Sequence, residues 1–348
     1  MTAFWFGVVS VMLAVYVVLD GFDFGAGTIH RLVAKTDNER RTVFAAIGPY
    51  WDGNEVWLIA GGGVLFFAFP RAYSAAFSGF YLPLTIVLWL LIFRGISIEF
   101  RSHVANPLWR EFWDSTFVVA SSLLAFVLGT ALGNVVRGVP LDISGFFAIP
   151  LFTNFQPSSH PGAFDWYTLL VGLFALMLLA GHGALFLVWK TSGEVQTRSR
   201  RIAWGAWLAI LPIWIAVTAS TAGLRWSIYA NLIGRPWSWI LVVLIFAGIA
   251  GVIQFQRRGR DGAAFLSSCL FIAAILASTM AGLYPDLLPS SIDPAASLGA
   301  TNAATGEHGL RVGMTWWSIG IGLAIIYFIY LFWSFAGKRA AGRVEDGY

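Results

Sequence analysis

Long apolar runs dominate this chain of 348 residues. A run of about 20 residues crosses the ~30 Å hydrocarbon core of a bilayer as a helix, and a helix satisfies its own backbone hydrogen bonds there. Hydrophobic residues make up 58% of the chain and charged residues only 11%, which argues against a soluble enzyme. The runs predict an all-α polytopic membrane protein, a single integral membrane domain over residues 1–348. We expect nine transmembrane helices at about 3–21, 47–69, 75–98, 116–136, 165–189, 202–223, 236–255, 263–284 and 312–336.

The positions of lysine and arginine predict the orientation of these helices, because both residues concentrate in short cytoplasmic loops. The segments after the first, third, fifth, seventh and ninth helices hold 17 of the 22 basic residues, Arg343 among them. We therefore expect a periplasmic N-terminus and a cytoplasmic C-terminus. The two longest loops, at about 137–164 and 285–311, would then be external.

The net charge of +4 needs no nucleic-acid partner. The basic residues form a collar at the expected cytoplasmic surface, where they suit the anionic headgroups of membrane lipid. The single cysteine, Cys269, lies in an apolar run and is interpreted as a small buried hydrophobe.

Four carboxyl groups stand out against this apolar background. Asp52 and Glu55 lie where the second helix enters the membrane, and each costs roughly 2.5–3.5 kcal/mol in a span even on a lenient scale. Asp20 and Asp23 lie at the expected cytoplasmic end of the first helix, and their spacing puts both on one face. Because the second helix enters from the same side, the four predict a file of acids leading inward. Arg94 in the third helix supplies a counter-charge.

Two functional interpretations fit such a file: a proton entry path, or a cation site in a secondary transporter. The structural alternative is that the acids cap helix ends and that Glu55 pairs with Arg94. The sequence leaves this open for Asp20 and Asp23 and favours function for Asp52 and Glu55. A transporter built from two related halves would repeat such a site, and the later helices show no counterpart.

The scarcity of histidine limits the chemistry that the chain itself can perform. Only His182 is expected well inside a span, and we assign it to helix packing; His30 is placed in a loop or at a helix end. Haem subunits usually need several buried axial ligands, and the chain has neither a zinc-type cluster nor a Walker loop. No metal site is predicted. Trp51 and Trp57 flank the acidic pair. They could contact a cofactor or quinone, or simply pack between helices, and packing is favoured.

Several ordered motifs carry a resemblance to one family. The stretches at 19–27 (LDGFDFGAG) and 48–57 (GPYWDGNEVW) resemble subunit II of the cytochrome bd quinol oxidases. The segments at 94–101, 182–194, 284–290, 302–304 and 335–338 continue the resemblance in order to the C-terminus. Phe24 and Tyr50 are mild departures from the pattern, and neither removes an ionisable group.

The resemblance implies a nine-helix subunit paired with a similar, larger subunit I in the bacterial cytoplasmic membrane. The complex would oxidise quinol and reduce O2 to water, taking protons from the cytoplasm and building a proton gradient without pumping. Two haems b and one haem d would be ligated by subunit I, and none by this chain. Which quinone serves, whether small accessory subunits bind, and whether a quinone or lipid lies structurally against this subunit are left open.

By the same resemblance, Asp52 would donate protons to a path through this chain. Trp51 and Arg94 would lie near the partner's haem region, Trp51 in packing and Arg94 in compensating haem propionates or Asp52. Three further carboxyl groups would support the path: Asp20, Asp23 and Glu55. A secondary transporter and a purely structural scaffold subunit are the competing hypotheses.

Overall fold

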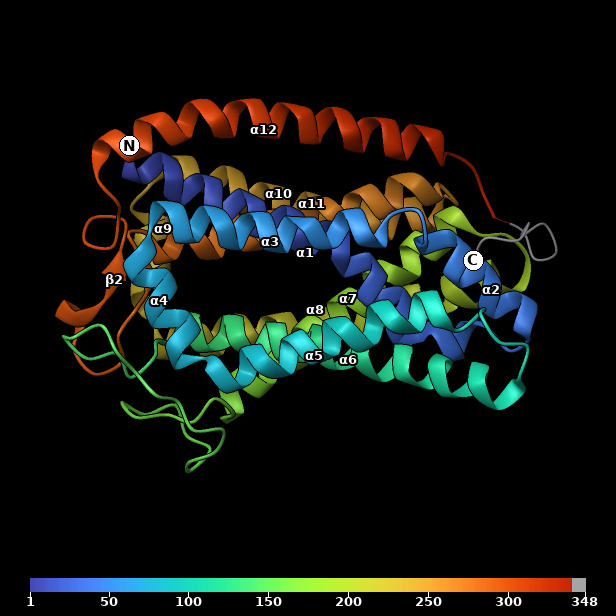
Figure 1. Ribbon diagram of the computed structural model, residues 1–348, viewed down its shortest axis with the longest axis horizontal. Coiled ribbons are helices and arrows are strands. Elements are labelled where there is room, and N and C mark those ends of the chain that lie inside the picture. The colour runs from blue at the N-terminus through green and yellow to red at the C-terminus, as the bar shows by residue number, and fades with distance from the viewer. Residues whose placement is uncertain (340–348) are drawn as a thin grey trace.

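The computed structural model describes residues 1–339, so Arg343 lies outside the described residues. Within them the chain is almost entirely helical (Figure 1). A small antiparallel sheet pairs β1 (Asp286–Leu288) with β2 (Leu298–Gly299). The helices are α1 (Thr2–Val33), α2 (Asp37–Ile47), α3 (Trp51–Ala68), α4 (Pro70–Gly79), α5 (Tyr81–Phe100), α6 (Pro107–Arg137), α7 (Trp166–Lys190), α8 (Gly193–Leu224), α9 (Trp226–Ile233), α10 (Trp239–Arg257), α11 (Asp261–Leu283) and α12 (Glu307–Ser334).

Eight helices of the described chain are long and apolar enough to cross a membrane, which confirms a polytopic helical membrane protein. They are α1, α5, α6, α7, α8, α10, α11 and α12. The range 47–69, expected as a further span, is largely helical as α3 but is not among the eight, because Asp52, Asn54 and Glu55 make its first turn polar. The count of nine spans and the orientation of the termini therefore stay predictions.

Several helix boundaries differ from the sequence-based expectation; α6 and α8, for example, each begin nine residues earlier than expected. α1 continues past residue 21 to Val33, so Asp20 and Asp23 lie within a long helix rather than at its end. α3 begins only at Trp51, after a separate helix α2. The range 75–98 is interrupted at Phe80, where α4 gives way to α5, and Pro70 occupies a first-turn position of α4, where proline is tolerated.

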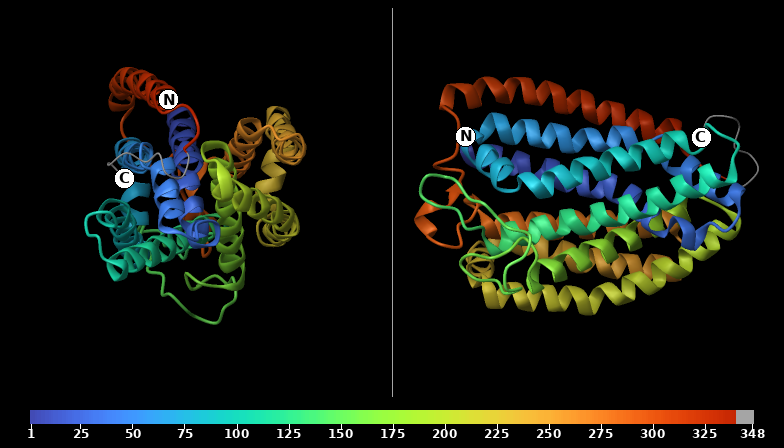
Figure 2. Two further views of the ribbon diagram at one scale, coloured as in Figure 1. Left: turned by 90° about the vertical axis from the view of Figure 1, so that its right-hand side faces the viewer. Right: turned by 60° about the horizontal axis from the view of Figure 1, so that its bottom comes forward.

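α1 lies at the centre of the bundle and packs against α3, α6, α7 and α11. At the crossing of α1 and α7 the two helix backbones are in direct contact. There is no room for a side chain there, since a methyl group added at Gly25 would lie 2.7 Å from the amide nitrogen of Gly183. Small residues at such crossings allow membrane helices to approach closely. α12 runs along the outside and buries only Leu310 and Leu331, as the red helix in Figures 1 and 2 shows.

The two ends of the bundle differ in character. At the end that we call the loop end, the segments 138–165 and 284–306 lie together (Figure 2). The Val139 N–H donates to the Pro289 carbonyl at 3.0 Å. At the other end, which we call the basic end, lie α2 and the turn between α5 and α6 (Figure 1). There Tyr50 Oη and Lys190 Nζ both donate to the carbonyl of Phe335, which anchors the segment after α12.

Candidate functional site

A group of polar side chains lies between α1, α3 and α5. We call it the inner cluster; it consists of Asp20, Asp23, Asn54, Glu55 and Arg94. The Arg94 guanidinium donates to Asp20 Oδ1 at 2.5 Å and also to Glu55. Asn54 Nδ2 donates to Asp23 Oδ2 at 2.7 Å. Glu55 keeps 24% of its side chain exposed, whereas the other four are fully buried.

Local structure explains how these side chains meet. Asp20 and Asp23 are one turn apart on α1 and share a face. Asn54 and Glu55 come from the first turns of α3, which packs on α1. The guanidinium of Arg94 lies over the ring of Phe24 at 4.6 Å, a cation–π contact that holds it at α1.

The inner cluster contains more acid than base, with three carboxyl groups facing one guanidinium. Burying an uncompensated ion costs several kcal/mol even after the protein relaxes. A buried cluster of this composition is therefore expected to hold protons in place of the missing positive charge. This property suits a group that takes up and releases protons.

Several buried polar atoms in this region have no hydrogen-bond partner within residues 1–339. They are Tyr16 Oη, Asp20 Oδ2, Asp23 Oδ1, Asn54 Oδ1 and Arg94 Nε. Native proteins satisfy almost all such atoms, commonly with ordered water. The inner cluster thus offers the acceptors and donors that a short file of water molecules would need.

The structure brings together four of the six residues that the sequence singled out: Asp20, Asp23, Glu55 and Arg94. Trp51 lies beside them, since a methyl group added at Gly95 would come 3.3 Å from its ring.

Asp52 stands apart from this group. Its side chain is exposed in the isolated chain and forms no hydrogen bond or ion pair with the described residues. Arg94 forms ion pairs with Asp20 and Glu55. It does not pair with Asp52, which was one of the two roles expected for it. Whether Asp52 donates protons stays a prediction.

Sequence reasoning missed Tyr16 and Asn54. Tyr16 lies one turn before Asp20 on the same face of α1, and this i, i+4 spacing was a signal that could have identified it. Asn54 lies between Asp52 and Glu55, and an uncharged amide gives no comparable energetic signal in the sequence.

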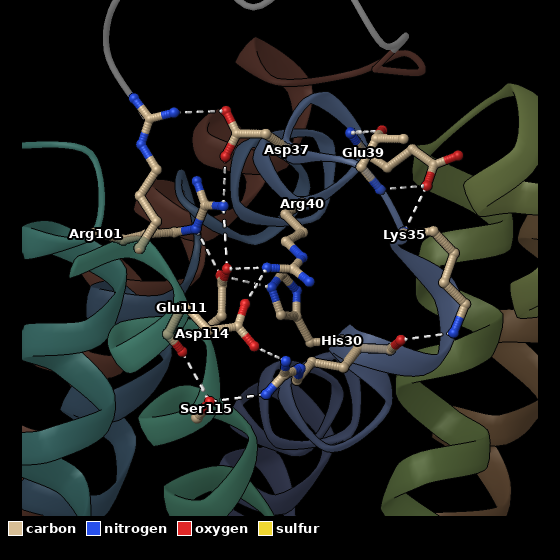
Figure 3. Close-up of polar contacts among 12 residues, drawn as sticks. His30, Lys35, Asp37, Glu39, Arg40, Arg101, Glu111, Asp114 and Ser115 are labelled. Carbon is tan, nitrogen blue, oxygen red and sulfur yellow. Dashed lines mark hydrogen bonds and ion pairs between the residues drawn. The ribbon is translucent and has the colours of Figure 1, made fainter. Parts of the chain in front are cut away.

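A second group of charged side chains, also missed, lies at the basic end (Figure 3). We call it the outer cluster; it consists of His30, Asp37, Arg40, Arg101, Glu111 and Asp114. Asp114 is its centre, with Arg101 Nε at 2.6 Å and the Arg40 guanidinium at 2.8 Å. Burial lowers the pKa of Arg101, but hydrogen bonds to Asp114 and Asp37 outweigh it and leave that pKa above its ordinary value.

His182 tests whether this chain could ligate a haem. The side chain is fully buried in α7, with Nδ1 2.7 Å from Ser268 Oγ and Nε2 2.9 Å from the carbonyl oxygen of Val18. Because both ring nitrogens are engaged, His182 does not fit the role of an axial haem ligand. Among residues 1–339, no group of three or more His, Cys, Asp and Glu side chains could hold a metal ion.

An apolar groove of about 580 Å³ lies between α3, α12 and the start of α1. Its lining includes Trp5, Phe67, Val312 and Trp316. A surface of this kind suits an acyl or isoprenoid chain, so the question of a structural quinone or lipid has a candidate location.

Comparison with known proteins agrees with the resemblance seen in the motifs. A sequence model of the cytochrome bd terminal oxidase subunit II family matches residues 1–335. The chain is 31% identical to cytochrome bd-I ubiquinol oxidase subunit 2 of Escherichia coli K12, over 98% of this chain and 96% of that protein. It is also 31% identical to cytochrome bd ubiquinol oxidase subunit 2 of Bacillus subtilis 168, over 88% of each.

The fold is similar to that of a chain in the structure of bd oxidase from Geobacillus thermodenitrificans. The TM-score is 0.74 at 20% sequence identity, and the match covers 95% of this chain and 97% of that one. This likeness supports the arrangement of helices described above.

Proposed function

Because the chain belongs to the cytochrome bd terminal oxidase subunit II family, we propose that it supports a haem-bearing subunit I and supplies a proton path to it. Membership makes the chain part of an oxidoreductase complex in a membrane. In the proposed reaction, the complex oxidises quinol and reduces O2 to water. Each electron delivered to O2 consumes a proton, so a route for protons into the protein is part of the chemistry.

The inner cluster is the observation that supports this role. Its three carboxyl groups exceed its one guanidinium, and its unpartnered oxygens can bind water. Asp23 and Asp20 would receive protons within α1, and Glu55, which is partly exposed, would pass them towards the surface of α3. Arg94 would hold Asp20 and Glu55 in place between transfers.

Asp52 would complete the path at that surface. An exposed carboxylate in contact with hydrocarbon is costly, so we propose that subunit I covers this part of α3 in the complex. Trp51, against Gly95 and next to Arg94, would pack near the partner's haem region. The two haems b and the haem d would be ligated by subunit I, where they supply the electron transfer and the O2 chemistry.

We place the basic end in the cytoplasm, because lysine and arginine favour that side. Protons would then come from the cytoplasm, and the loop end would face the periplasm of a bacterial cytoplasmic membrane. Small accessory subunits could bind the outer helices without altering this path.

The competing hypotheses make different use of the same acids. In a scaffold subunit the inner cluster would only fasten α1, α3 and α5 together. In a secondary transporter it would bind the transported ion; a site of that kind is often repeated in two halves, whereas these acids lie on α1 and α3 alone.

The variant Asp52→Asn tests the proposal. In the purified complex with subunit I, we expect O2 consumption to slow while the haem absorption spectrum stays unchanged. The exposed Asp142, at the loop end, provides a matched control as Asp142→Asn. Normal turnover in Asp52→Asn would refute the proton-donor role, and loss of haem would indicate a role in assembly instead.

A further inference from the structure

The outer cluster includes a fully buried histidine, His30, which can exist in a neutral or a charged form. An ion-pair network alone would not need such a residue. His30 Nε2 lies 3.0 Å from Asp114 Oδ1, and neither side chain is exposed. His30 Nδ1 has no partner among the described residues. A histidine with one free nitrogen can take up a proton there and release it again.

His30 lies on the same face of α1 as the acids of the inner cluster. At 100° per residue, positions 16, 20, 23, 27 and 30 fall within about 80° of the helix circumference. Tyr16, Asp20, Asp23 and His30 occupy four of these positions, and Gly27 the other. Asp23 and His30 are about 10 Å apart along the helix axis at 1.5 Å per residue.

Ser121 of α6 lies at the level of this gap. A methyl group added at Gly27 would lie 2.5 Å from Ser121 Cβ, so the serine packs directly on the glycine. Ser115, Thr116 and Thr130 of the same helix donate to the carbonyl four residues earlier. The buried hydroxyl of Ser121 makes no such bond and has no partner within residues 1–339. It is therefore free to bind water or to relay a proton between His30 and Asp23.

The outer cluster is graded from the surface inward. Glu111 and Asp37 are partly exposed, with 45% and 41% of their side chains accessible, whereas Asp114 is fully buried. Arg40 and Arg101 link these carboxylates to Asp114. Carboxylates, which can attract protons, thus extend from the protein surface to His30.

We propose that protons enter this chain at the His30–Asp114 pair and pass along one face of α1, by way of Ser121 beside Gly27, to Asp23 and Asp20. His30 takes up a proton beside the Asp114 carboxylate and gives it to water at Ser121, which returns the imidazole to its neutral form. Asp23 accepts that proton. The inference rests on the proposed function, because it names the entrance of that path.

The groups that face His30 set the condition for this transfer. The Asp114 carboxylate of α6 lies beside the imidazole, and Arg101 at the end of α5 and Arg40 of α2 pair with that same carboxylate. The rings of Phe44 and Phe117 cover the imidazole at 4.9 Å and 5.5 Å between centroids. His30 is thus poised between opposite charges and shielded from bulk water.

The decisive variant is His30→Gln, because glutamine can still donate a hydrogen bond to Asp114 but cannot carry a proton. The complex with subunit I is reconstituted into vesicles of phosphatidylethanolamine and phosphatidylglycerol, and proton uptake and O2 consumption are measured with a short-chain quinol. We expect both rates to fall by about a hundredfold or more, the order by which removing a proton-transfer group slows a reaction. The ratio of rates in H2O and D2O should rise, and the haem spectrum should stay unchanged.

Two further variants distinguish a proton relay from a purely structural role of these residues. Arg200→Gln removes a partly exposed ion pair with Asp261 and should leave both rates unchanged, because neither residue belongs to the relay or to the outer cluster. Ser121→Ala removes only the free hydroxyl and should slow proton uptake; it decides the matter if His30→Gln does not assemble. Normal proton uptake in an assembled His30→Gln complex, or in Ser121→Ala, would overturn the inference.

Measuring Asp52→Asn in the same vesicles distinguishes the two proposals. If Asp52→Asn is slow while His30→Gln and Ser121→Ala are normal, the path exists but its entrance lies elsewhere. If all three variants turn over normally, the proton path itself is refuted.

Discussion

Removal of the buried guanidinium in the inner cluster should destabilise the protein in a pH-dependent way. Arg94 is fully buried and bonds to both Asp20 and Glu55. In the variant Arg94→Met these carboxylates lose their cation, and breaking a buried pair by removing one partner costs about 3–5 kcal/mol. We expect a loss of this size in the free energy of unfolding at pH 7.

At lower pH, protons bound to the carboxyl groups can replace the positive charge of the guanidinium. The loss of stability in Arg94→Met should therefore depend on pH. Holding one carboxyl group protonated at pH 7 costs roughly 4 kcal/mol, from a reference pKa of about 3.9 and about 1.4 kcal/mol per pH unit. At pH 5.5 the same step costs roughly 2 kcal/mol. The destabilisation by Arg94→Met should therefore be about 2 kcal/mol smaller at pH 5.5 than at pH 7.

The assay is equilibrium unfolding of the purified complex in detergent micelles, followed by tryptophan fluorescence at both pH values. Arg71→Met is the matched control, since Arg71 is exposed and bonds to the carbonyl of Asn302, and such changes usually stay within about 0.5 kcal/mol. The double variant Arg94→Met/Asp20→Asn should recover part of the loss. An equal loss at both pH values, or a double variant no more stable than Arg94→Met, would refute the reasoning.

Two other predictions concern packing and the basic end. Gly183→Ala should destabilise the protein by about 1–3 kcal/mol, because the new methyl group would lie 2.6 Å from Gly25 Cα; thermal unfolding measures this, and Gly205→Ala, which meets nothing within 4 Å, should be neutral or stabilising. Burial raises the pKa of Glu39, but hydrogen bonds from Arg198 and two backbone N–H groups outweigh it and leave that pKa below its ordinary value. Glu39 therefore contributes stability at neutral pH that is lost as the pH falls through its lowered pKa, so the difference in melting temperature between wild type and Glu39→Gln should vanish in acid. A difference that is constant from pH 7 to about pH 3 would contradict this.

The membrane class and most helices could be predicted because each depends on a local run of apolar residues. The end of α1 could not. Asp20, Asp23 and Gly25 look like the end of a span, since charges and glycines usually lie at the surface. They stay within the helix because the glycine lets α7 approach and because Arg94 meets Asp20, and neither partner is visible from the local sequence.

The candidate site was predicted in part for the same reason. Energetic cost identified the acids, because a carboxyl group in a span is unusual wherever it lies. It could not say which of them are paired, and so Asp52, expected in one file with the other three acids, lies apart from the cluster. The outer cluster was missed because His30 and Asp114 are 84 residues apart and each alone looks like an ordinary helix-end residue.

The pairing of Asp20 with Arg94 also has a consequence for how the protein is made. The two residues are 74 positions apart in the chain, and synthesis at about 5–20 residues per second separates them by roughly 4–15 seconds. During this interval α1 carries two acids into the membrane with no cation to meet them. α1 therefore becomes stable in lipid only after α5 has been made, and we expect it to stay with the insertion machinery until α5 has left the ribosome.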